Sequence, residues 1–316
     1  MIGRKAVVLA AAAVAVASTA VVAWASPQFS GWAPAALVDQ VDASGVNTPA
    51  QDGCPIQSPD GLNLYIASNR PGSAGLDLWV AHRGSTGEAW SNPVNVNDEL
   101  GADLNTAADE FCPTPVRGNG LFFVRRPSLC GLGDIYFARY NAAHGWSEPE
   151  RLACAPEGPN TALDEMGPSY VEAGGGARLY YSSSRTAAQG GFVAGNIFMS
   201  RFGANGTFGP GELVAELSDP TANDIQPNVR KDGQEVVLSS NRSGGSGSQD
   251  IWVANRENGG ETWSQPVNLG TNINTSASES RPSLSWDGET LYFGRAPAAG
   301  GPGDVYVTTR FKTSSP

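Results

Sequence analysis

The strongest constraint on this chain is a short pattern that recurs along its length, in which an acidic residue is followed three positions later by proline. Successive acids are 58, 55, 59 and 55 residues apart: Asp52, Glu110, Glu165, Asp224 and Glu279. A regular period of this kind predicts a repeat architecture, in which one small unit of structure is copied several times.

Each repeat contains the same four short apolar or aromatic segments, separated by Gly-, Pro- and Asn-rich turns. In the first repeat they begin near Asp52, Leu64, Asp77 and Trp90. Four short antiparallel strands per unit are typical of a β-propeller blade. The last repeat has no fourth segment, but residues 29–38 supply one, which would leave no sheet edge exposed. We therefore predict an all-β fold, a single five-bladed propeller whose N-terminal strand closes the last blade.

The repeat resembles a known family at Ser239–Gly245 and at the Asp-Ile-Trp segment that begins at Asp250. Together with the acid-x-x-Pro element and Leu-Tyr-Phe strands, these segments are similar to the TolB-like (WD-repeat-like) β-propeller repeat. The resemblance covers nearly the whole chain after its first residues and implies the propeller fold. It does not specify an activity, because such blades occur in binding proteins, scaffolds and some enzymes.

The N-terminus reads as a secretory signal peptide: Arg4 and Lys5, an apolar run from Ala6 to Val22, and an Ala-x-Ala site ending at Ala25. The alternative is a membrane anchor, but the run is barely long enough to span a bilayer. We predict a signal peptide over residues 1–25 and a propeller over residues 26–316. The mature protein should be secreted or periplasmic, without a membrane span.

The formal net charge is −11 and becomes −13 when Arg4 and Lys5 are removed. Such acidity argues against nucleic acid or an anionic membrane as partner. It suits cations, basic ligands or neutral sugars, although acidity also serves solubility alone. We expect a monomer whose partner is an extracellular small molecule, a glycan or a protein.

Four cysteines in an exported chain predict disulfides, and three pairings are possible. Cys54 and Cys112 precede the repeat proline in consecutive repeats, whereas Cys130 and Cys154 fall in loops of the second repeat. We favour the pairs Cys54–Cys112 and Cys130–Cys154.

The five repeated acids should lie near one mouth of a central channel, because they begin the innermost strands. A ring of carboxylates could bind Ca²⁺ or another hard cation as a cofactor, or supply paired acids for glycoside hydrolysis. A residue present in every blade is more often part of the architecture, so the alternative is that each acid is satisfied within its own blade.

The repeat departs from its own pattern at three arginines. Arg125 and Arg295 replace the serine of other repeats, and Arg281 lies two residues after Glu279. These side chains either neutralise the acids or bind a carboxylate or phosphate of a ligand. The long loop at residues 186–195 is either a lid or a tolerated insertion.

No nucleophile elbow, metalloprotease motif or phosphate-binding loop is present, and His82 and His144 read as surface residues. The leading prediction is a binding or interaction module that presents an acidic, arginine-flanked channel mouth. The alternative is a carbohydrate-active enzyme, a hydrolase or lyase, that uses those carboxylates and arginines. A structural scaffold with every acid satisfied internally is the third possibility.

Overall fold

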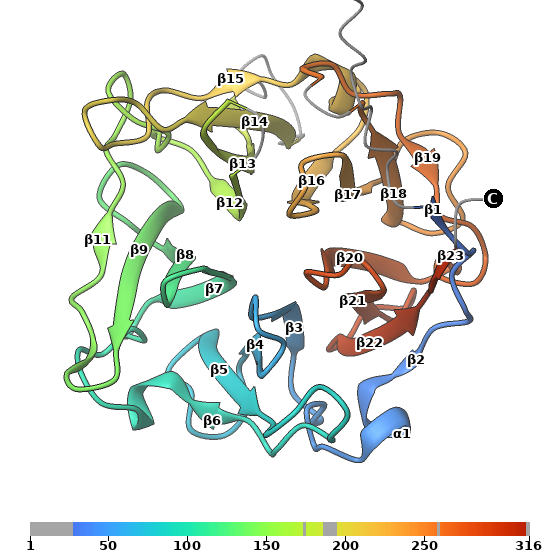
Figure 1. The fold of residues 1–316 in the computed structure, drawn as a ribbon, viewed down its shortest axis with the longest axis horizontal. Helices are drawn as coiled ribbons and strands as arrows, with labels where there is room; N and C mark the ends of the chain where they lie inside the picture. Colours follow the sequence, from blue (N-terminus) through green and yellow to red (C-terminus); the bar gives the residue numbers. More distant parts are fainter. Residues whose placement is uncertain (1–27, 173–174, 186–194, 258–259, 314–316) are drawn as a thin grey trace, which may run out of the picture.

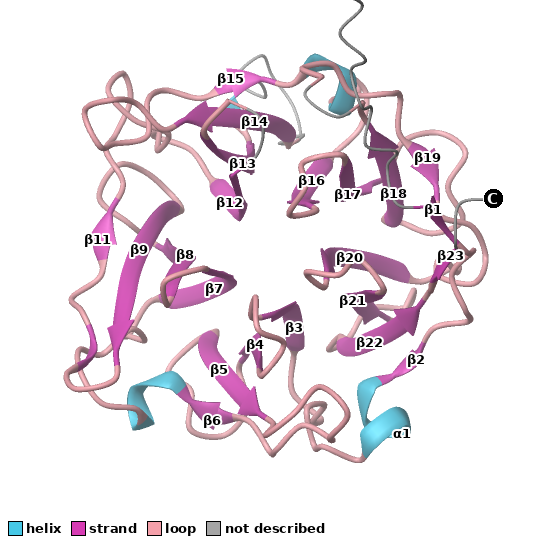
Figure 2. Ribbon diagram, viewed as in Figure 1, coloured by secondary structure: helices cyan, strands magenta, loops and turns pink. Residues whose placement is uncertain are grey.

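The structure is a computed structural model that describes residues 28–172, 175–185, 195–257 and 260–313. Its strands form five antiparallel sheets arranged in a ring and a separate two-stranded sheet (Figure 1). The predicted all-β class and five-bladed propeller are confirmed, and helix is confined to short segments (Figure 2). The predicted signal peptide lies outside the described residues. In the ranges given above, no helix is long and apolar enough to cross a membrane.

Within each blade the strands follow one another outward from the axis. Blade one contains β3 (Asp52–Gln57), β4 (Asn63–Ser68), β5 (Asp77–His82) and β6 (Val94–Asn95). Blade two contains β7 (Asp109–Val116), β8 (Gly120–Arg126) and β9 (Asp134–Asn141), with β10 (Gly145–Trp146) and β11 (Glu150–Arg151) both paired to β9. Blade three contains β12 (Glu165–Glu172), β13 (Ala177–Ser183), β14 (Asn196–Arg201) and β15 (Glu212–Leu213).

The last two blades follow the same order. Blade four contains β16 (Asp224–Val229), β17 (Glu235–Ser240), β18 (Asp250–Asn255) and β19 (Val267–Asn268). Blade five contains β20 (Ser278–Leu284), β21 (Thr290–Ala296), β22 (Asp304–Thr309) and, from the other end of the chain, β2 (Ala36–Leu37). The described helices are short: α1 (Val38–Asp42), η1 (Val96–Asp98) and η3 (Ala215–Leu217).

The ring is closed as predicted, by an N-terminal strand that completes the last blade. In β2, Ala36 pairs with Val307 and Leu37 with Tyr306 of β22. A second pairing was not predicted: β1 (Gln28–Phe29) pairs with β23 (Lys312–Thr313). Residues from both ends of the described chain therefore hold each other in place.

The core lies between neighbouring blades, so both faces of each sheet are covered. Leu78, Leu121 and Tyr136 belong to a buried cluster shared by blades one and two. Another cluster joins Phe122 of blade two to Phe198 of blade three. Burying a side chain of this size contributes about 1.5–3 kcal/mol, which explains why the inner strands are apolar along most of their length.

Every innermost strand contains the same irregularity, a shift of pairing register two residues after its acid. The residues at this position all have positive φ, from 48° to 60°: Cys54, Cys112, Gly167, Gln226 and Arg281. We call these five the axial ring. A bulge adds one residue and so breaks the alternation of side chains between the two faces. The axial ring lines a small central cavity, whereas the five acids do not.

Candidate functional site

Each of the five repeated acids is bound within its own blade. All five have a relative exposure of 0%. In blade two, Thr106 donates its backbone N–H and its hydroxyl to Glu110, at 2.9 and 2.8 Å. Thr161, Thr275 and Thr48 bind Glu165, Glu279 and Asp52 in the same way. In blade four, the backbone N–H of Asp219 replaces this threonine.

An arginine completes each of these networks. In blade one, Arg70 contacts Asp52 at 2.6 Å and donates to the carbonyl of Val46. Arg125 contacts Glu110 at 2.6 Å and donates to the carbonyl of Leu104, which occupies the corresponding position. Arg125, which departs from the repeat pattern in the sequence, therefore binds the same two groups of its blade as Arg70 does, from a different position in the strand.

Arg295 has the same role in blade five. Its Nε lies 2.7 Å from Glu279, and its Nη2 donates to the carbonyl of Ile273 at 2.7 Å. Arg125 and Arg295 are thus internal counterions, which was one of the two predicted roles. The other predicted role, binding of a ligand carboxylate or phosphate, has no support in this geometry because both guanidinium groups are already engaged.

The proposed Ca²⁺ site at Asp52, Glu110, Glu165, Asp224 and Glu279 is not formed. Among the described residues, no three His, Cys, Asp or Glu side chains are grouped so that they could hold a metal ion. Calcium takes six to eight oxygen ligands, but each of these carboxylates faces donors of its own blade. Burial also raises the pKa of Glu110 and Glu165, and the bonds from threonine and arginine offset only part of that rise.

The axial ring encloses a cavity of about 30 Å³. The predicted position of Arg281 beside the acids is wrong, because this side chain lines the cavity and forms no ion pair with a described carboxylate. The predicted Cys54–Cys112 disulfide is not formed: both residues are free cysteines, with their sulfur atoms 2.6 Å apart. The other predicted pair, Cys130–Cys154, forms a disulfide.

The predicted lid at residues 186–195 lies almost entirely outside the described residues, which resume at Gly195. Among the described residues, the end of the propeller that carries the acids offers buried networks whose five arginines are already paired. A hollow larger than the axial cavity lies elsewhere.

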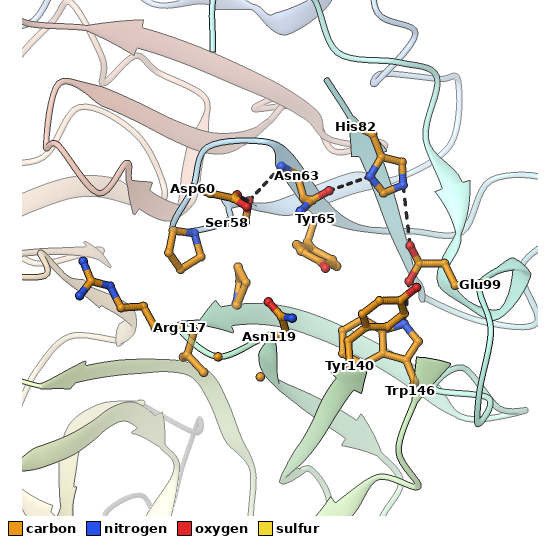
Figure 3. Close-up of a pocket in the computed structure, with 15 residues that line it drawn as sticks. Ser58, Asp60, Asn63, Tyr65, His82, Glu99, Arg117, Asn119, Tyr140 and Trp146 are labelled. Carbon is orange, nitrogen blue, oxygen red and sulfur yellow. Dashed lines mark hydrogen bonds and ion pairs between the residues drawn. The ribbon is translucent and has the colours of Figure 1, made fainter. Parts of the chain in front are cut away.

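A groove between blades one and two has a volume of about 580 Å³ (Figure 3). Its inner part is formed where β3 and β7 end, at the opposite end of these strands from the acids. The following residues line it: Ser58, Pro59, Asp60, Asn63, Tyr65, His82, Glu99, Pro115, Val116, Arg117, Gly118, Asn119, Gly120, Tyr140 and Trp146. Apolar rings and polar groups thus share one cavity of the size typical for ligand sites.

Glu99 is the centre of a hydrogen-bonded group at one end of the groove (Figure 3). Trp146 donates its indole N–H to Glu99 at 2.7 Å. His82 lies between two oxygens, with Nδ1 2.7 Å from Asn63 and Nε2 3.8 Å from Glu99. Tyr140 packs edge-on against Trp146, with ring centroids 5.1 Å apart. These contacts fix the carboxylate of Glu99, whose side chain remains 21% exposed.

Two other ionisable groups of the groove keep one protonation state. Burial, followed by the charge of Glu99, raises the pKa of Tyr65, which therefore stays a neutral phenol. Burial acts to raise the pKa of Asp60, but bonds from Ser58 and from the Leu62 backbone outweigh it and lower that pKa. Asp60 is therefore an anion at neutral pH.

Sequence reasoning missed this groove. It placed His82 at the surface, where 45% of the side chain is indeed exposed, but it sought a site only at the end of the propeller where the acids lie. The available signal was Trp146, which begins the fourth segment of repeat two directly after a turn. Its partner Glu99 is 47 positions away, in the connection from blade one to blade two.

No protein-family model matches the chain, and no curated protein matches its sequence. Solved structures do match its fold. An α-L-arabinofuranosidase from Lactobacillus brevis aligns with a TM-score of 0.56 and 12% identity, over 85% of this chain and 94% of that one. A xylan β-1,4-xylosidase from Bacillus halodurans C-125 has a TM-score of 0.52 and 15% identity, over 84% of this chain and 53% of that one.

An endo-arabinase from Bacteroides thetaiotaomicron aligns with a TM-score of 0.51 and 14% identity, over 84% of this chain and 96% of that one. At such identities the comparison shows a shared five-bladed propeller and nothing finer.

Proposed function

We propose that this protein is a carbohydrate-active propeller that acts outside the cytoplasm and binds a glycan chain in the groove between blades one and two. The observation that carries the proposal is the lining of that groove, where aromatic rings alternate with amide, imidazole and carboxylate groups. Sugars present C–H faces that pack on aromatic rings and hydroxyls that need such planar hydrogen-bonding groups. The Cys130–Cys154 disulfide supports an exported location.

The enzymes that share this fold support the same class of ligand. An arabinofuranosidase, a xylosidase and an endo-arabinase favour a carbohydrate-active enzyme over a module that only binds. The predicted alternative, a carbohydrate-active enzyme, is therefore better supported than the leading prediction, a binding or interaction module. The acids of the opposite mouth do not supply its chemistry, because a carboxylate with 0% exposure cannot reach a substrate.

We further propose glycoside hydrolysis as the reaction, with Asp60 and Glu99 as the two carboxylates. Hydrolysis of a glycosidic bond commonly uses one carboxylate as proton donor and another as base or nucleophile. Asp60 and Glu99 line the same groove. Hydrogen bonds within its own turn keep Asp60 ionised, which suits the role of base or nucleophile. We assign Glu99, whose carboxylate is held by Trp146, as the proton donor to the leaving oxygen.

The proposal is tested by screening oligosaccharides of arabinose and xylose against the mature protein, by calorimetry and by the release of reducing ends. Glu99→Gln should abolish cleavage and retain binding, because the amide keeps the shape of the carboxylate without its proton chemistry. Asn119→Ala should weaken binding. The matched control is Glu148→Gln, an exposed residue that does not line the groove.

The possible outcomes separate the two levels of the proposal. Binding without cleavage in the unmodified protein would overturn the hydrolase assignment and leave a glycan-binding protein. Cleavage that survives Glu99→Gln would place the reaction elsewhere. Failure to bind any sugar of the panel would overturn the glycan site.

A further inference from the structure

Two thiols meet at the axis of the propeller, in a place that plays no part in the groove. Cys54 and Cys112 belong to the axial ring, and their sulfur atoms are 2.6 Å apart. They lie on the innermost strands of blades one and two, and each is only 5% exposed. Their backbones share the left-handed conformation, with φ of 48° and 50°, so the bulge itself brings the side chains together.

A guanidinium group accompanies this pair. Arg281 belongs to the same ring, in blade five, and forms no ion pair with any carboxylate among the described residues. A Cβ placed on Gly53 would come within 2.8 Å of its Nη1, so the guanidinium packs against the residue that precedes Cys54. A cation removed from water is costly without a counterion, and the charges that act on this guanidinium are those of the Cys54 and Cys112 sulfurs.

We propose that Cys54 and Cys112 form a redox-active dithiol at the axis, in which Cys54 reacts as the thiolate, Cys112 resolves the oxidised sulfur, and Arg281 positions and stabilises the thiolate. The electrostatic environment agrees with this asymmetry. Burial acts to raise the pKa of Cys54, but the hydrogen bond from Cys112 and the charge of Arg281 lower it overall. Burial and the neighbouring Cys54 raise the pKa of Cys112.

The cavity restricts the oxidant to a small molecule. A space of about 30 Å³ admits hydrogen peroxide and excludes larger disulfide reagents such as oxidised glutathione. The side chain of Gln226 completes the wall, with Nε2 3.9 Å from the Cys112 sulfur. Its Oε1 is buried without a hydrogen-bond partner in the part of the chain described. An unsatisfied buried acceptor is expected where a small polar molecule binds.

The reaction has two steps. The Cys54 thiolate attacks one oxygen of hydrogen peroxide, the O–O bond breaks, and the product is a sulfenic acid at Cys54 with hydroxide, which takes a proton to become water. The Cys112 sulfur then attacks the Cys54 sulfur, the S–O bond breaks, and the leaving hydroxide carries away the Cys112 proton as water. Two thiols and one peroxide give one disulfide and two waters.

The test uses the two single variants, since neither can form the disulfide between the blades. In Cys112→Ser, one equivalent of hydrogen peroxide should generate a sulfenic acid at Cys54. Because the cavity excludes larger reagents, dimedone traps this acid only after the oxidised protein is unfolded in urea that contains dimedone, and peptide mass spectrometry reads the product. In Cys54→Ser, trapping at Cys112 should be at least about tenfold lower, because the rate follows the thiolate fraction. In the unmodified, reduced protein, the same treatment should give the Cys54–Cys112 disulfide.

Arg281→Gln tests the role of the guanidinium. Glutamine already occupies this ring position in blade four with a φ of 52°, close to the 58° of Arg281, so the backbone should accept it. In the Cys112→Ser background this change should slow trapping by about tenfold. The control is Arg201→Gln, because the side chain of Arg201 is half-exposed and does not line the axial cavity.

Equal trapping in both single variants would overturn the assignment of Cys54 as the reactive thiolate. An unchanged rate in Arg281→Gln would remove Arg281 from the proposal. No trapping in Cys112→Ser, when its melting temperature shows a folded protein and Cys130–Cys154 is intact, would refute the redox site itself. None of these results depends on sugar binding in the groove.

Discussion

At the scale of single residues, the repeated acids act as staples between a loop and a blade. Each carboxylate meets an arginine of the next strand or its end. Four of the five also receive donors from a threonine before the strand, as Glu279 does from Thr275, and Asp224 receives the backbone N–H of Asp219 instead. Fully buried carboxylates are tolerated only when their oxygens are bonded in this way. The repetition of the acid therefore reflects a requirement of the blade and carries no information about a ligand.

Thr275→Val removes one of these donors without changing the size of the side chain. The hydroxyl donates to Glu279 at 2.6 Å in a buried setting. A hydrogen bond to a charged group contributes about 1.5–3 kcal/mol, and we expect a loss of that size in the free energy of unfolding measured with urea. In the control, Thr221→Val, the hydroxyl of exposed Thr221 donates to Asp219, so the loss should be below about 0.5 kcal/mol. Equal losses would contradict the staple role.

The buried glutamates also predict a pH dependence. Burial, only partly offset by Ser183, Thr161 and Arg185, raises the pKa of Glu165 in the folded protein. The folded state therefore holds this proton more tightly than the unfolded state, so the contribution of Glu165 to stability is present at low pH and is lost as pH rises through the folded pKa. The advantage in melting temperature of the unmodified protein over Glu165→Gln should be larger at pH 4 than at pH 7.

Asp287 provides the opposite case in the same chain. Burial acts to raise its pKa, but bonds from Ser285 and from the Glu289 backbone lower it overall. Its contribution is present above the unfolded pKa and is lost as pH falls through the folded pKa. Against Asp287→Asn, the unmodified protein should therefore gain its advantage at pH 7 and lose it towards pH 3. The same pH trend in both comparisons would be inconsistent with this account.

At the scale of the element, the closure of blade five rests on two residues of β2 and the segment that surrounds them. Trp32 and Val38 are buried on either side of β2, and Asn272 donates to the carbonyl of Trp32 at 2.8 Å. The strand β2 also covers the outer edge of β22. A short element is thus sufficient to close the ring because its flanks are anchored in the core.

Deletion of residues 28–42 should lower the melting temperature and cause self-association, because β22 then becomes an exposed edge strand. Light scattering and thermal melting measure the two effects. Deletion of residues 312–316 is the control. Among the described residues it removes the pairing of β1 with β23 and the contacts of Lys312 with Glu289, and it leaves β2 on β22. A truncated protein that melts like the complete one would show that β2 does not close the ring.

The whole molecule shows why the fold could be predicted from the sequence. The repeat period, the aromatic residue that begins each fourth segment, such as Trp146, and the missing fourth segment of the last repeat are all visible in the sequence. They are visible because every blade packs in the same way and uses similar residues. The resemblance to the TolB-like repeat stays a prediction, since no family model matches. The shared fold with propeller hydrolases rests on structure alone.

The candidate site could not be predicted in this way, for physical reasons that the individual residues make clear. Glu99 lies in a connection between blades, whereas His82 ends β5 and Trp146 ends β10, and no fixed spacing relates the three. Arg125 seemed functional because it breaks the pattern, yet its Nη2 reaches the carbonyl of Leu104, the acceptor that Arg70 finds at Val46. A sequence shows which position an arginine occupies but not how far its side chain reaches.

The pairing of β1 with β23 has a consequence for topology. Gln28 lies opposite Thr313, so the two ends of the described chain meet on one side of the ring. A short linker could join them, and new ends could be opened in a turn between any two blades without breaking a sheet. In such circular permutants the order of the blades in space is kept while the order of their synthesis changes. The fold is then defined by the cyclic order of its blades and does not depend on the blade at which the chain starts.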